Sequence, residues 1–216
     1  MAKKNNSNSQ LPSSISARGC RIAQPSSEFY SIFSPEEVLG IIDALEIRRE
    51  FPLKYSYKGR GAKIWDNFYV KYITPKWYRS SSTEIDLLKE NFDFLNGHLQ
   101  NYNKVNIVDV GAGNSYPVKE FIGRLHQLGR INKYIALDIS QGLLQVSKNN
   151  FTHWFPTIDF ISSPIDIENH CLSEILLKNQ VNLEPEHTAQ IFLHLGVTMG
   201  NHQNRAGAFK NFRDSM

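Results

Sequence analysis

Short apolar runs alternate with amphipathic stretches over the second half of the chain. The run at residues 105–110 is rich in β-branched side chains, which is typical of a strand buried on both faces of a parallel sheet. Further runs at 134–137, 158–161 and 190–195 predict three more strands. The segments between these runs, and the one after the last run, have apolar residues at helical spacing, which predicts helices. The pattern therefore predicts an α/β fold with a parallel, right-handed wound sheet.

The helices before the first strand are predicted from their ends and their apolar faces. Ser34 can cap a helix that begins at Pro35 and continues through Leu45, because Ser, Pro and the acids behind them are typical of a helix start. Thr83 can cap a second helix, which we expect to be continuous and to pack against the sheet. Its apolar stripe consists of Ile85, Leu88, Phe92, Leu95 and Leu99.

Further helices are expected to alternate with the strands along the sequence. One ends at Gly129, one begins at Ser140, and the last follows the fourth strand. The first of them is expected to have an apolar face of Val118, Phe121, Ile122, Leu125 and Leu128, and the last is expected to carry Ala206, Phe209 and Phe212.

Composition divides the chain into three regions. Residues 1–30 are rich in Ser and Asn, which predicts a disordered tail. Residues 31–100 are expected to form a helical, aromatic-rich lobe, and residues 101–216 a cofactor-binding domain. Within the lobe, residues 51–80 interleave aromatic and basic side chains, which could stack nucleobases or line a small-molecule pocket. We favour the pocket, because no recognised nucleic-acid fold accompanies the segment.

The most informative chemistry follows the first two strands. Gly111 and Gly113 allow a tight turn with no Cβ to block a ligand, and the second strand ends at Asp138. An acid at that position can accept hydrogen bonds from two ribose hydroxyls, which indicates an adenosine-containing cofactor. Because Tyr116 occupies the place of the third glycine of the dinucleotide fingerprint, the turn favours S-adenosylmethionine over a nicotinamide cofactor. Asp109, at the end of the first strand, could meet the cofactor's ammonium group.

Charge and cysteine content change this picture little. Lys and Arg number 24 against 21 Asp and Glu, and a net charge of +3 does not by itself indicate a nucleic-acid partner. Cys20 and Cys171 form no metal or disulfide pattern, which favours a cytoplasmic protein without a bound metal. No apolar run approaches the ~18 residues of a membrane span, so no membrane partner is expected.

Several motifs, in order, resemble those of the histidine-specific, S-adenosylmethionine-dependent methyltransferases of ergothioneine biosynthesis. The matching segments are YKGRGAKIW at 57–65, PKWY at 75–78 with Thr83-Glu84, GAG at 111–113, LDIS at 137–140 and LGVTMGN at 195–201. The resemblance implies a class I, Rossmann-like methyltransferase that transfers a methyl group to the amine of an amino acid.

The resemblance also implies roles for single residues. The cofactor would be held by Asp109, Gly111, Gly113, Asp138, Ser140 and Asp166, the last of these through the adenine amino group. The amino-acid substrate would be held by Tyr57, Trp77, Tyr78 and Asn201. Asn201 could alternatively cap the helix that follows it. No catalytic base is evident.

The sequence departs from the family pattern in two ways. Trp77 and Lys58 replace a tyrosine and an acid of the motifs, which leaves the substrate open between histidine and a related aromatic amino acid. Family members also extend beyond the point that corresponds to Met216, so we expect this chain to be an incomplete enzyme with an unfinished sheet edge. Such an edge could bind a partner chain or a second copy.

Two other functions are compatible with these departures. One is a catalytically incompetent S-adenosylmethionine-binding fragment or subunit that acts as an interaction module. The other is a nucleic-acid methyltransferase, which is disfavoured because Gly196 to Asn201 stand where an Asn-Pro-Pro-Tyr type of motif would hold a flipped base.

Overall fold

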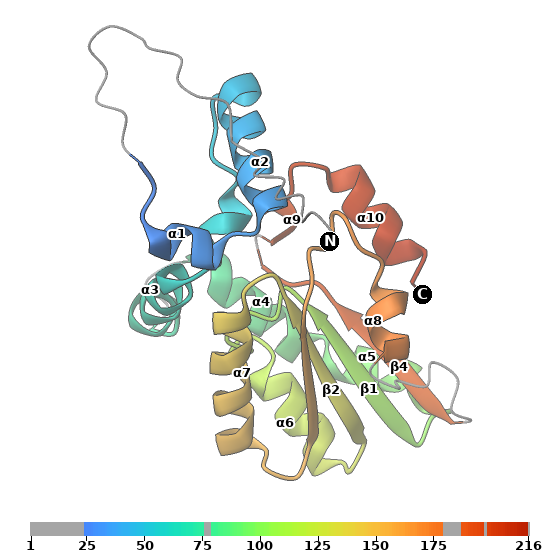
Figure 1. Cartoon of the computed structure of the whole chain (residues 1–216). Helices are drawn as coiled ribbons and strands as arrows, with labels where there is room; N and C mark the ends of the chain where they lie inside the picture. The colour runs from blue at the N-terminus through green and yellow to red at the C-terminus, as the bar shows by residue number, and fades with distance from the viewer. Residues whose placement is uncertain (1–23, 76–78, 179–186, 197, 216) are drawn as a thin grey trace, which may run out of the picture.

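The chain forms a sheet with helices on both faces, preceded by a helical lobe (Figure 1). The computed structural model describes residues 24–75, 79–178, 187–196 and 198–215, with the side chains of residues 79–82 and 178 excepted.

Four parallel strands form the sheet, in the order β3-β2-β1-β4. The strands are β1 (Lys104–Val110), β2 (Ile131–Asp138), β3 (Asp159–Pro164) and β4 (Thr188–Leu193). The register sets Asp109 beside Leu193, and Asp138 beside Pro164. The carboxyl ends of the four strands therefore lie at the same end of the sheet. The predicted parallel α/β fold is confirmed.

Helices pack on both faces of the sheet. α6 (Lys119–Gln127) and α7 (Gln141–Trp154) supply buried side chains to one face, and α8 (Leu172–Lys178) and α10 (Arg205–Arg213) supply them to the other. The short helix α9 (Thr198–Asn201) follows β4 and leads into α10. Gly129 and Ser140 end and begin their helices as predicted, since Gly129 has a φ of +67° and the Ser140 side chain accepts a hydrogen bond from Leu143 N.

The described part of the N-terminal lobe is helical. Its elements are α1 (Ser27–Ile32), α2 (Pro35–Asp43), η1 (Ala44–Arg48), η2 (Leu53–Tyr57), α3 (Arg60–Phe68), η3 (Tyr69–Ile73), α4 (Arg79–Glu90) and α5 (Phe92–His98). α2 begins as predicted, because Ser34 Oγ accepts from Glu37 N and the Glu37 carboxylate accepts from Ser34 N. In Figure 1, α1, α2 and α3 gather above one end of the sheet.

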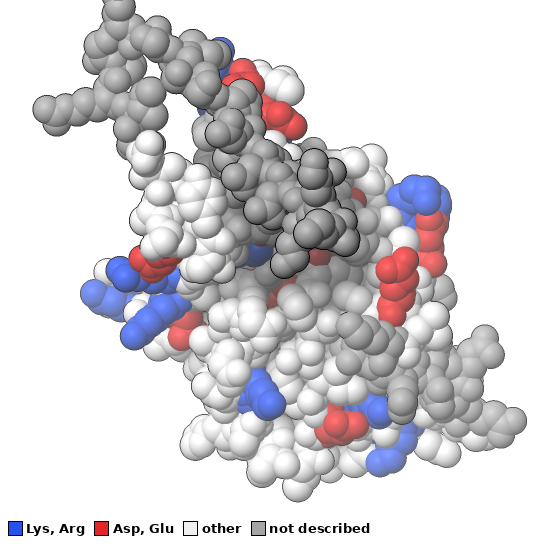
Figure 2. Space-filling view, viewed as in Figure 1, with Lys and Arg blue, Asp and Glu red and all other residues white. Residues whose placement is uncertain are grey.

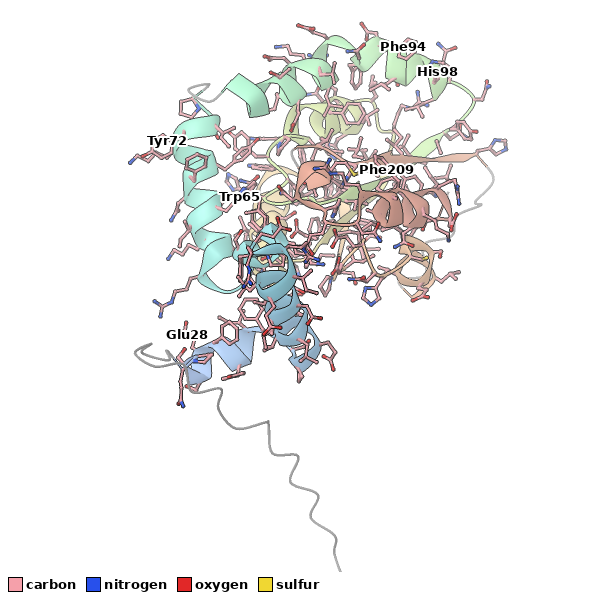
Figure 3. The ribbon with its side chains drawn as sticks, turned by 90° about the horizontal axis from the view of Figure 1, so that it is seen from above. Glu28, Trp65, Tyr72, Phe94, His98 and Phe209 are labelled. Atoms are coloured by element: carbon pink, nitrogen blue, oxygen red, sulfur yellow. The ribbon has the colours of Figure 1, made fainter. Side chains whose placement is uncertain are left out.

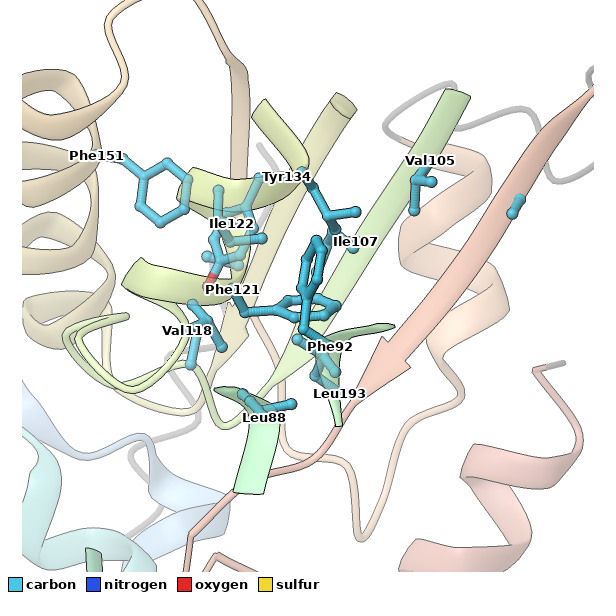
Figure 4. Packing of buried hydrophobic residues seen from close by; sticks show 14 of the residues in the cluster. Leu88, Phe92, Val105, Ile107, Val118, Phe121, Ile122, Tyr134, Phe151 and Leu193 are labelled. Atoms are coloured by element: carbon cyan, nitrogen blue, oxygen red, sulfur yellow. The ribbon is translucent and has the colours of Figure 1, made fainter. Parts of the chain in front are cut away.

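Aromatic and β-branched side chains fill the core beneath α6 and α7 (Figure 4). Phe92 of α5 and Phe121 of α6 meet edge to face, with ring centroids 5.8 Å apart. Tyr134 and Phe151 stack with centroids 4.0 Å apart. Burying a large apolar side chain contributes roughly 1.5–3 kcal/mol, so these contacts make the sheet a rigid base for the residues at its edge.

The expected disordered tail overlaps an ordered helix. α1 lies within residues 1–30, and the Ser26 side chain caps it by accepting a hydrogen bond from Phe29 N. The helical lobe therefore begins earlier than the composition predicts, because a serine cap is a local signal that a low apolar content conceals.

The continuous helix predicted after Thr83 is wrong. The helix divides at Asn91, where φ is −97° and ψ is 10°, and Thr83 lies inside α4 rather than at its start. The Asn91 side chain donates to the carbonyl of Leu87 at 2.9 Å. An asparagine amide that binds nearby backbone competes with regular helix, which explains the break. The expected packing is confirmed for Leu88, Phe92 and Leu99, which are buried.

The predicted final helix is confirmed as α10, and only some of its apolar residues face the sheet. Ala208 is 1% exposed and Phe212 packs on Phe192, whereas Phe209 is 56% exposed and Ala206 also faces solvent. Ala208 and Phe212 are four residues apart and make one narrow stripe, which is the only side of α10 that meets the described sheet. Leu128, predicted on an apolar face, is likewise 56% exposed just beyond the end of α6.

Candidate functional site

The glycine turn after β1 is shaped by its backbone and by two neighbouring side chains. Gly111 and Gly113 have φ values of +79° and +56°, which L side chains rarely adopt. A Cβ on Gly111 would lie 2.8 Å from Thr198 Cγ2, and a Cβ on Gly113 would lie 2.9 Å from Trp65 Cη2. The Thr198 and Trp65 side chains thus lie where a Cβ would stand, while both glycines still line a cavity. Figure 3 shows Trp65 on the side of α3 that faces the rest of the molecule.

Asp138 joins the two turns that follow β1 and β2. Its Oδ2 accepts from Gly113 N at 3.0 Å, and its Oδ1 accepts from Ser140 N at 2.8 Å. Burial raises the pKa of this carboxyl group to about 6, against the opposing effect of these backbone donors. A carboxylate has about four lone-pair sites, so Asp138 can still accept from a ligand.

Asp109 lies at the end of β1 and is almost entirely buried. Its Oδ2 accepts a hydrogen bond from the Tyr134 hydroxyl at 2.6 Å. Burial raises the pKa of Asp109 to about 7, and the nearby charge of Asp138 raises it further while Tyr134 lowers it. A carboxyl group with this pKa is suited to a cationic ligand, which would favour its ionised form.

Asp166, in the loop after β3, pairs with a lysine from the lobe. Lys54 Nζ lies 2.7 Å from Asp166 Oδ2 and 2.6 Å from Glu168 Oε2. Although burial lowers the pKa of Lys54, its hydrogen bonds to both carboxylates and their charges raise it overall. Sequence reasoning missed Lys54 and Glu168, because no pattern links residues more than 110 positions apart.

Two of the predicted substrate residues meet directly. Asn201 Nδ2 donates to the Tyr57 hydroxyl at 3.1 Å, although 144 positions separate them. Ser140 Oγ donates to the Tyr57 carbonyl at 2.6 Å, which ties η2 to the start of α7. The alternative that Asn201 caps the following helix is wrong, since Asn204 caps α10 instead.

Three predicted site residues remain, and the structure describes one of them, Ser140. Trp77 and Tyr78 lie outside the described residues. Ser140 is 1% exposed and stands behind the wall that its neighbour Ile139 forms, so its contacts here are with protein atoms.

We call the residues predicted to hold the cofactor the cofactor half of the site, and those predicted to hold the amino acid the substrate half. One cavity of about 280 Å³ connects the two halves and lies between the lobe and the carboxyl ends of the strands. This volume is just below the usual range for small-molecule sites, roughly 300–1,000 Å³. Both halves contribute polar wall residues, namely Lys54, Tyr57, Glu84, Asp109, Asp138, Asp166, Thr198, Asn201 and His202.

Carboxyl groups outnumber cations among these wall residues. Glu84, whose pKa is raised by burial, accepts a backbone hydrogen bond from Gly196 and adds a fourth acid to the three at the strand ends. Sequence reasoning included Glu84 in a motif but gave it no role. An acid-rich wall around one lysine favours ligands that carry positive charge, such as a sulfonium or an ammonium group.

A parallel sheet with a glycine turn after its first strand and an acid at the end of its second defines a Rossmann-like protein that binds an adenosine cofactor. The family described as histidine-specific, S-adenosylmethionine-dependent methyltransferase matches residues 37–216. The chain belongs to this family, and its cofactor is S-adenosylmethionine. The predicted family, fold class and cofactor are thereby confirmed.

Other comparisons are weaker. No curated protein matches the chain. Among solved structures, a candidate S-adenosyl-L-methionine-dependent methyltransferase from Methanococcus maripaludis is similar over 73% of this chain, with 14% sequence identity and a TM-score of 0.41. The match spans 58% of that protein's chain. Among the described helices of our chain, none has the length and apolar character to cross a membrane.

Proposed function

We propose that this chain is the cofactor-binding part of an enzyme that methylates the amine nitrogen of an amino acid, either histidine or a related aromatic amino acid. One observation carries the proposal: a single cavity joins the glycine turn and Asp138 to the Tyr57–Asn201 pair. A cofactor and an amino acid would therefore bind side by side. This is the reaction type that the resemblance to the ergothioneine methyltransferases implies.

The cofactor half lies over the first three strands. We assign it to Asp109, Gly111, Gly113, Asp138, Ser140 and Asp166. The unused lone pairs of Asp138 would accept from the ribose hydroxyls, and Asp109 would meet the cofactor's ammonium group. Asp166 would accept from the adenine amino group beside its ion pair with Lys54. Ser140 would act through the turn that it caps.

The substrate half lies under the lobe. Asn201 would contact the amino and carboxylate groups of the amino acid, and Tyr57 would line the space for its side chain, with Trp77 and Tyr78 as further wall residues. Methyl transfer requires an unprotonated amine in line with the methyl group, and such positioning supplies much of the rate. The acid-rich wall would hold both the sulfonium and the incoming ammonium before transfer.

Composition and surface charge support three further proposals, on the domain boundaries, the location and the substrate class. We propose that the substrate-side lobe, predicted at residues 31–100, begins with α1 at Ser27, and that residues 101–216 form the cofactor domain, in a cytoplasmic protein. Lys and Arg are interspersed with Asp and Glu over the face in Figure 2. A small-molecule substrate, rather than a nucleic acid, is consistent with this mixed charge, because phosphate-binding surfaces concentrate basic residues.

A second candidate function is suggested by the edge of the sheet. Among the described strands, β4 pairs only with β1, and both of its faces carry apolar residues. We propose that this edge accepts a strand from another segment or a second copy. A chain that binds cofactor without transferring methyl groups would then serve as a subunit or interaction module.

Calorimetry tests the cofactor half. We expect S-adenosylhomocysteine to bind the wild type and Asp138→Ala to bind it at least tenfold more weakly, since the variant loses the ribose acceptor and both turn contacts. Asp159→Ala is the matched control, because it removes an exposed acid at the amino end of β3. Equal affinities for wild type and Asp138→Ala, or tighter binding of NAD, would overturn the cofactor assignment.

The substrate half needs a separate measurement. Amino acids are titrated into the protein saturated with S-adenosylhomocysteine, and methylated products are sought by mass spectrometry with S-adenosylmethionine. We expect Asn201→Ala to weaken amino-acid binding without changing cofactor affinity. Cofactor binding with no response to any amino acid would favour the interaction module over the enzyme.

A further inference from the structure

One histidine lines the substrate half of the cavity and is not among the residues proposed to bind the cofactor or the amino acid. His202 follows Asn201, lines the same cavity, and has only 8% of its side chain exposed. Its Nε2 is buried and has no hydrogen-bond partner among the described residues. Since buried polar atoms are nearly always paired, this nitrogen is available to a ligand in the cavity.

Glu168 orients the imidazole of His202 from the opposite side. Its Oε1 lies 3.6 Å from His202 Nδ1 and accepts from the backbone N–H groups of Gln203 and Asn204. With its other oxygen Glu168 holds Lys54. A carboxylate fixed beside Nδ1 favours the proton on that nitrogen, which leaves Nε2 with its lone pair.

A second histidine lies against the first. The His194 ring stacks on His202 with centroids 5.7 Å apart and an interplanar angle of 10°. His194 Nδ1 donates to the Val110 carbonyl at 2.7 Å, which assigns its proton as well. Burial lowers the pKa of both imidazoles; for His202, Glu168 and Asp166 oppose this effect, whereas His194 and Lys54 add to it. His202 is therefore neutral near pH 7 and able to accept a proton.

Methyl transfer to an amine requires a group that takes a proton from the substrate. Near pH 7 an amino acid carries its amine mainly as ammonium, which has no lone pair for attack. The four carboxyl groups of the cavity attract an ammonium, and three of them, Asp109, Asp138 and Asp166, belong to the cofactor half. Tyr57 and His202 are neutral titratable side chains in the substrate half of the described wall. Burial raises the pKa of the Tyr57 hydroxyl, so Tyr57 keeps its own proton near pH 7, whereas the His202 imidazole can accept one.

We propose that His202 is the proton acceptor of the transfer reaction, a role that rests on the proposed amine methyltransferase function. Its Nε2 takes one proton from the substrate ammonium, and the freed lone pair on nitrogen attacks the methyl carbon of S-adenosylmethionine. The N–C bond forms as the C–S bond breaks, and the electron pair of that bond stays on sulfur. The imidazolium then releases its proton to solvent.

The test compares methyl transfer by wild type and His202→Gln at two pH values. Glutamine keeps a hydrogen-bond acceptor but cannot take the proton. Single-turnover rates are measured by mass spectrometry at high protein concentration, with L-histidine and L-tryptophan as probes, so that slow transfer is still counted. At pH 7 we expect His202→Gln to be about 100-fold slower. At about pH 9.5, where free amine is abundant in solution, the difference should shrink to less than about tenfold.

Controls separate this role from folding and from the proposed function. His98→Gln changes an exposed histidine on α5 and should match the wild type. S-adenosylhomocysteine affinity reports the fold of His202→Gln, and His202→Asn replaces it if that affinity is lost. A rate ratio that is the same at both pH values, or no loss at pH 7, overturns the role of His202 alone. No transfer by the wild type overturns the role of His202 in this chain and favours the subunit or interaction module over the enzyme.

Discussion

Gly113 meets two requirements at a single position. Its left-handed backbone conformation is strained for any side chain, and the space beside it is filled by the Trp65 ring. The same residue donates its N–H to Asp138. The contact with Trp65 fixes the lobe against the glycine turn, so the shape of the cofactor half depends on a residue outside the cofactor domain.

We therefore expect Gly113→Ala to reduce both stability and cofactor affinity. Strain and the Trp65 contact should lower the free energy of unfolding by about 2 kcal/mol, measured by urea denaturation. Gly97→Ala is the control, because Gly97 lies in α5 with no atom near its Cβ position, and alanine there should be neutral or stabilising by up to ~1 kcal/mol. Equal stability of the two variants would show that the turn is not strained.

The raised pKa of Asp109 predicts how the free energy of unfolding depends on pH. Burial raises its pKa to about 7 in the folded chain, above the ordinary value of 3.8, so the folded state holds a proton that the unfolded state has released. Stability from this group is therefore present at low pH and is lost as pH rises through the folded pKa. Between about pH 5 and about pH 7.5 the loss should be about 2 kcal/mol.

Asp109→Asn removes the titrating group and should reduce this loss. Urea unfolding of wild type and variant at both pH values measures the difference, and Asp159→Asn, at an exposed site, should behave like the wild type. If Asp109→Asn and the wild type lose stability equally as pH rises, then Asp109 is not the source.

At the scale of elements, η2 is held to the loop after β3 by one part-buried cation. Lys54 belongs to η2, whereas Asp166 and Glu168 follow β3, and Glu168 in turn binds the backbone that leads into α10. Lobe, sheet and last helix therefore share one ion-pair group. The lobe contains a comparable pair in Lys58 and Glu37, which joins only its own elements.

Lys54→Met should consequently destabilise the chain more than Lys58→Met. Loss of Lys54 leaves the buried Glu168 and the part-buried Asp166 without their cation and should lower the free energy of unfolding by about 3 kcal/mol. The more exposed Lys58 pair should contribute about 1 kcal/mol or less. Parallel urea titrations decide the matter, and a Lys54→Met variant no less stable than Lys58→Met would contradict the link.

For the whole molecule, the sheet edge at β4 is the feature with the largest consequence. Ile191 and Phe192 point to opposite faces and each is only half-buried. An edge strand also presents N–H and C=O groups that no described strand pairs. Such an edge is a template for another strand.

We expect the chain to self-associate as its concentration rises, as measured by sedimentation velocity. Thr188→Lys, at the start of β4, should weaken association because a charge on an edge strand opposes pairing. Ser162→Lys, on β3 at the other edge of the sheet, should not. A monomer at every concentration, or equal effects of both lysines, would remove this edge as the contact.

Local chemistry explains what the sequence by itself determined. The strands at 105–110 and 134–137, the glycine turn, the acid at the end of β2 and the Ser34 and Ser140 caps all depend on side chains within a few residues of one another. β-branched runs, positive φ at glycine and short-range capping need no distant partner. For the same reason the family motifs could be found in the sequence.

Tertiary structure alone decided the features that depend on distant partners. The pairs Lys54–Asp166 and Tyr57–Asn201 and the contact between Gly113 and Trp65 form only when the lobe folds over the sheet. The exposure of Phe209 likewise depends on what lies beside α10. Burial also sets the raised pKa of Asp109, since it is a property of the surroundings and not of the residue.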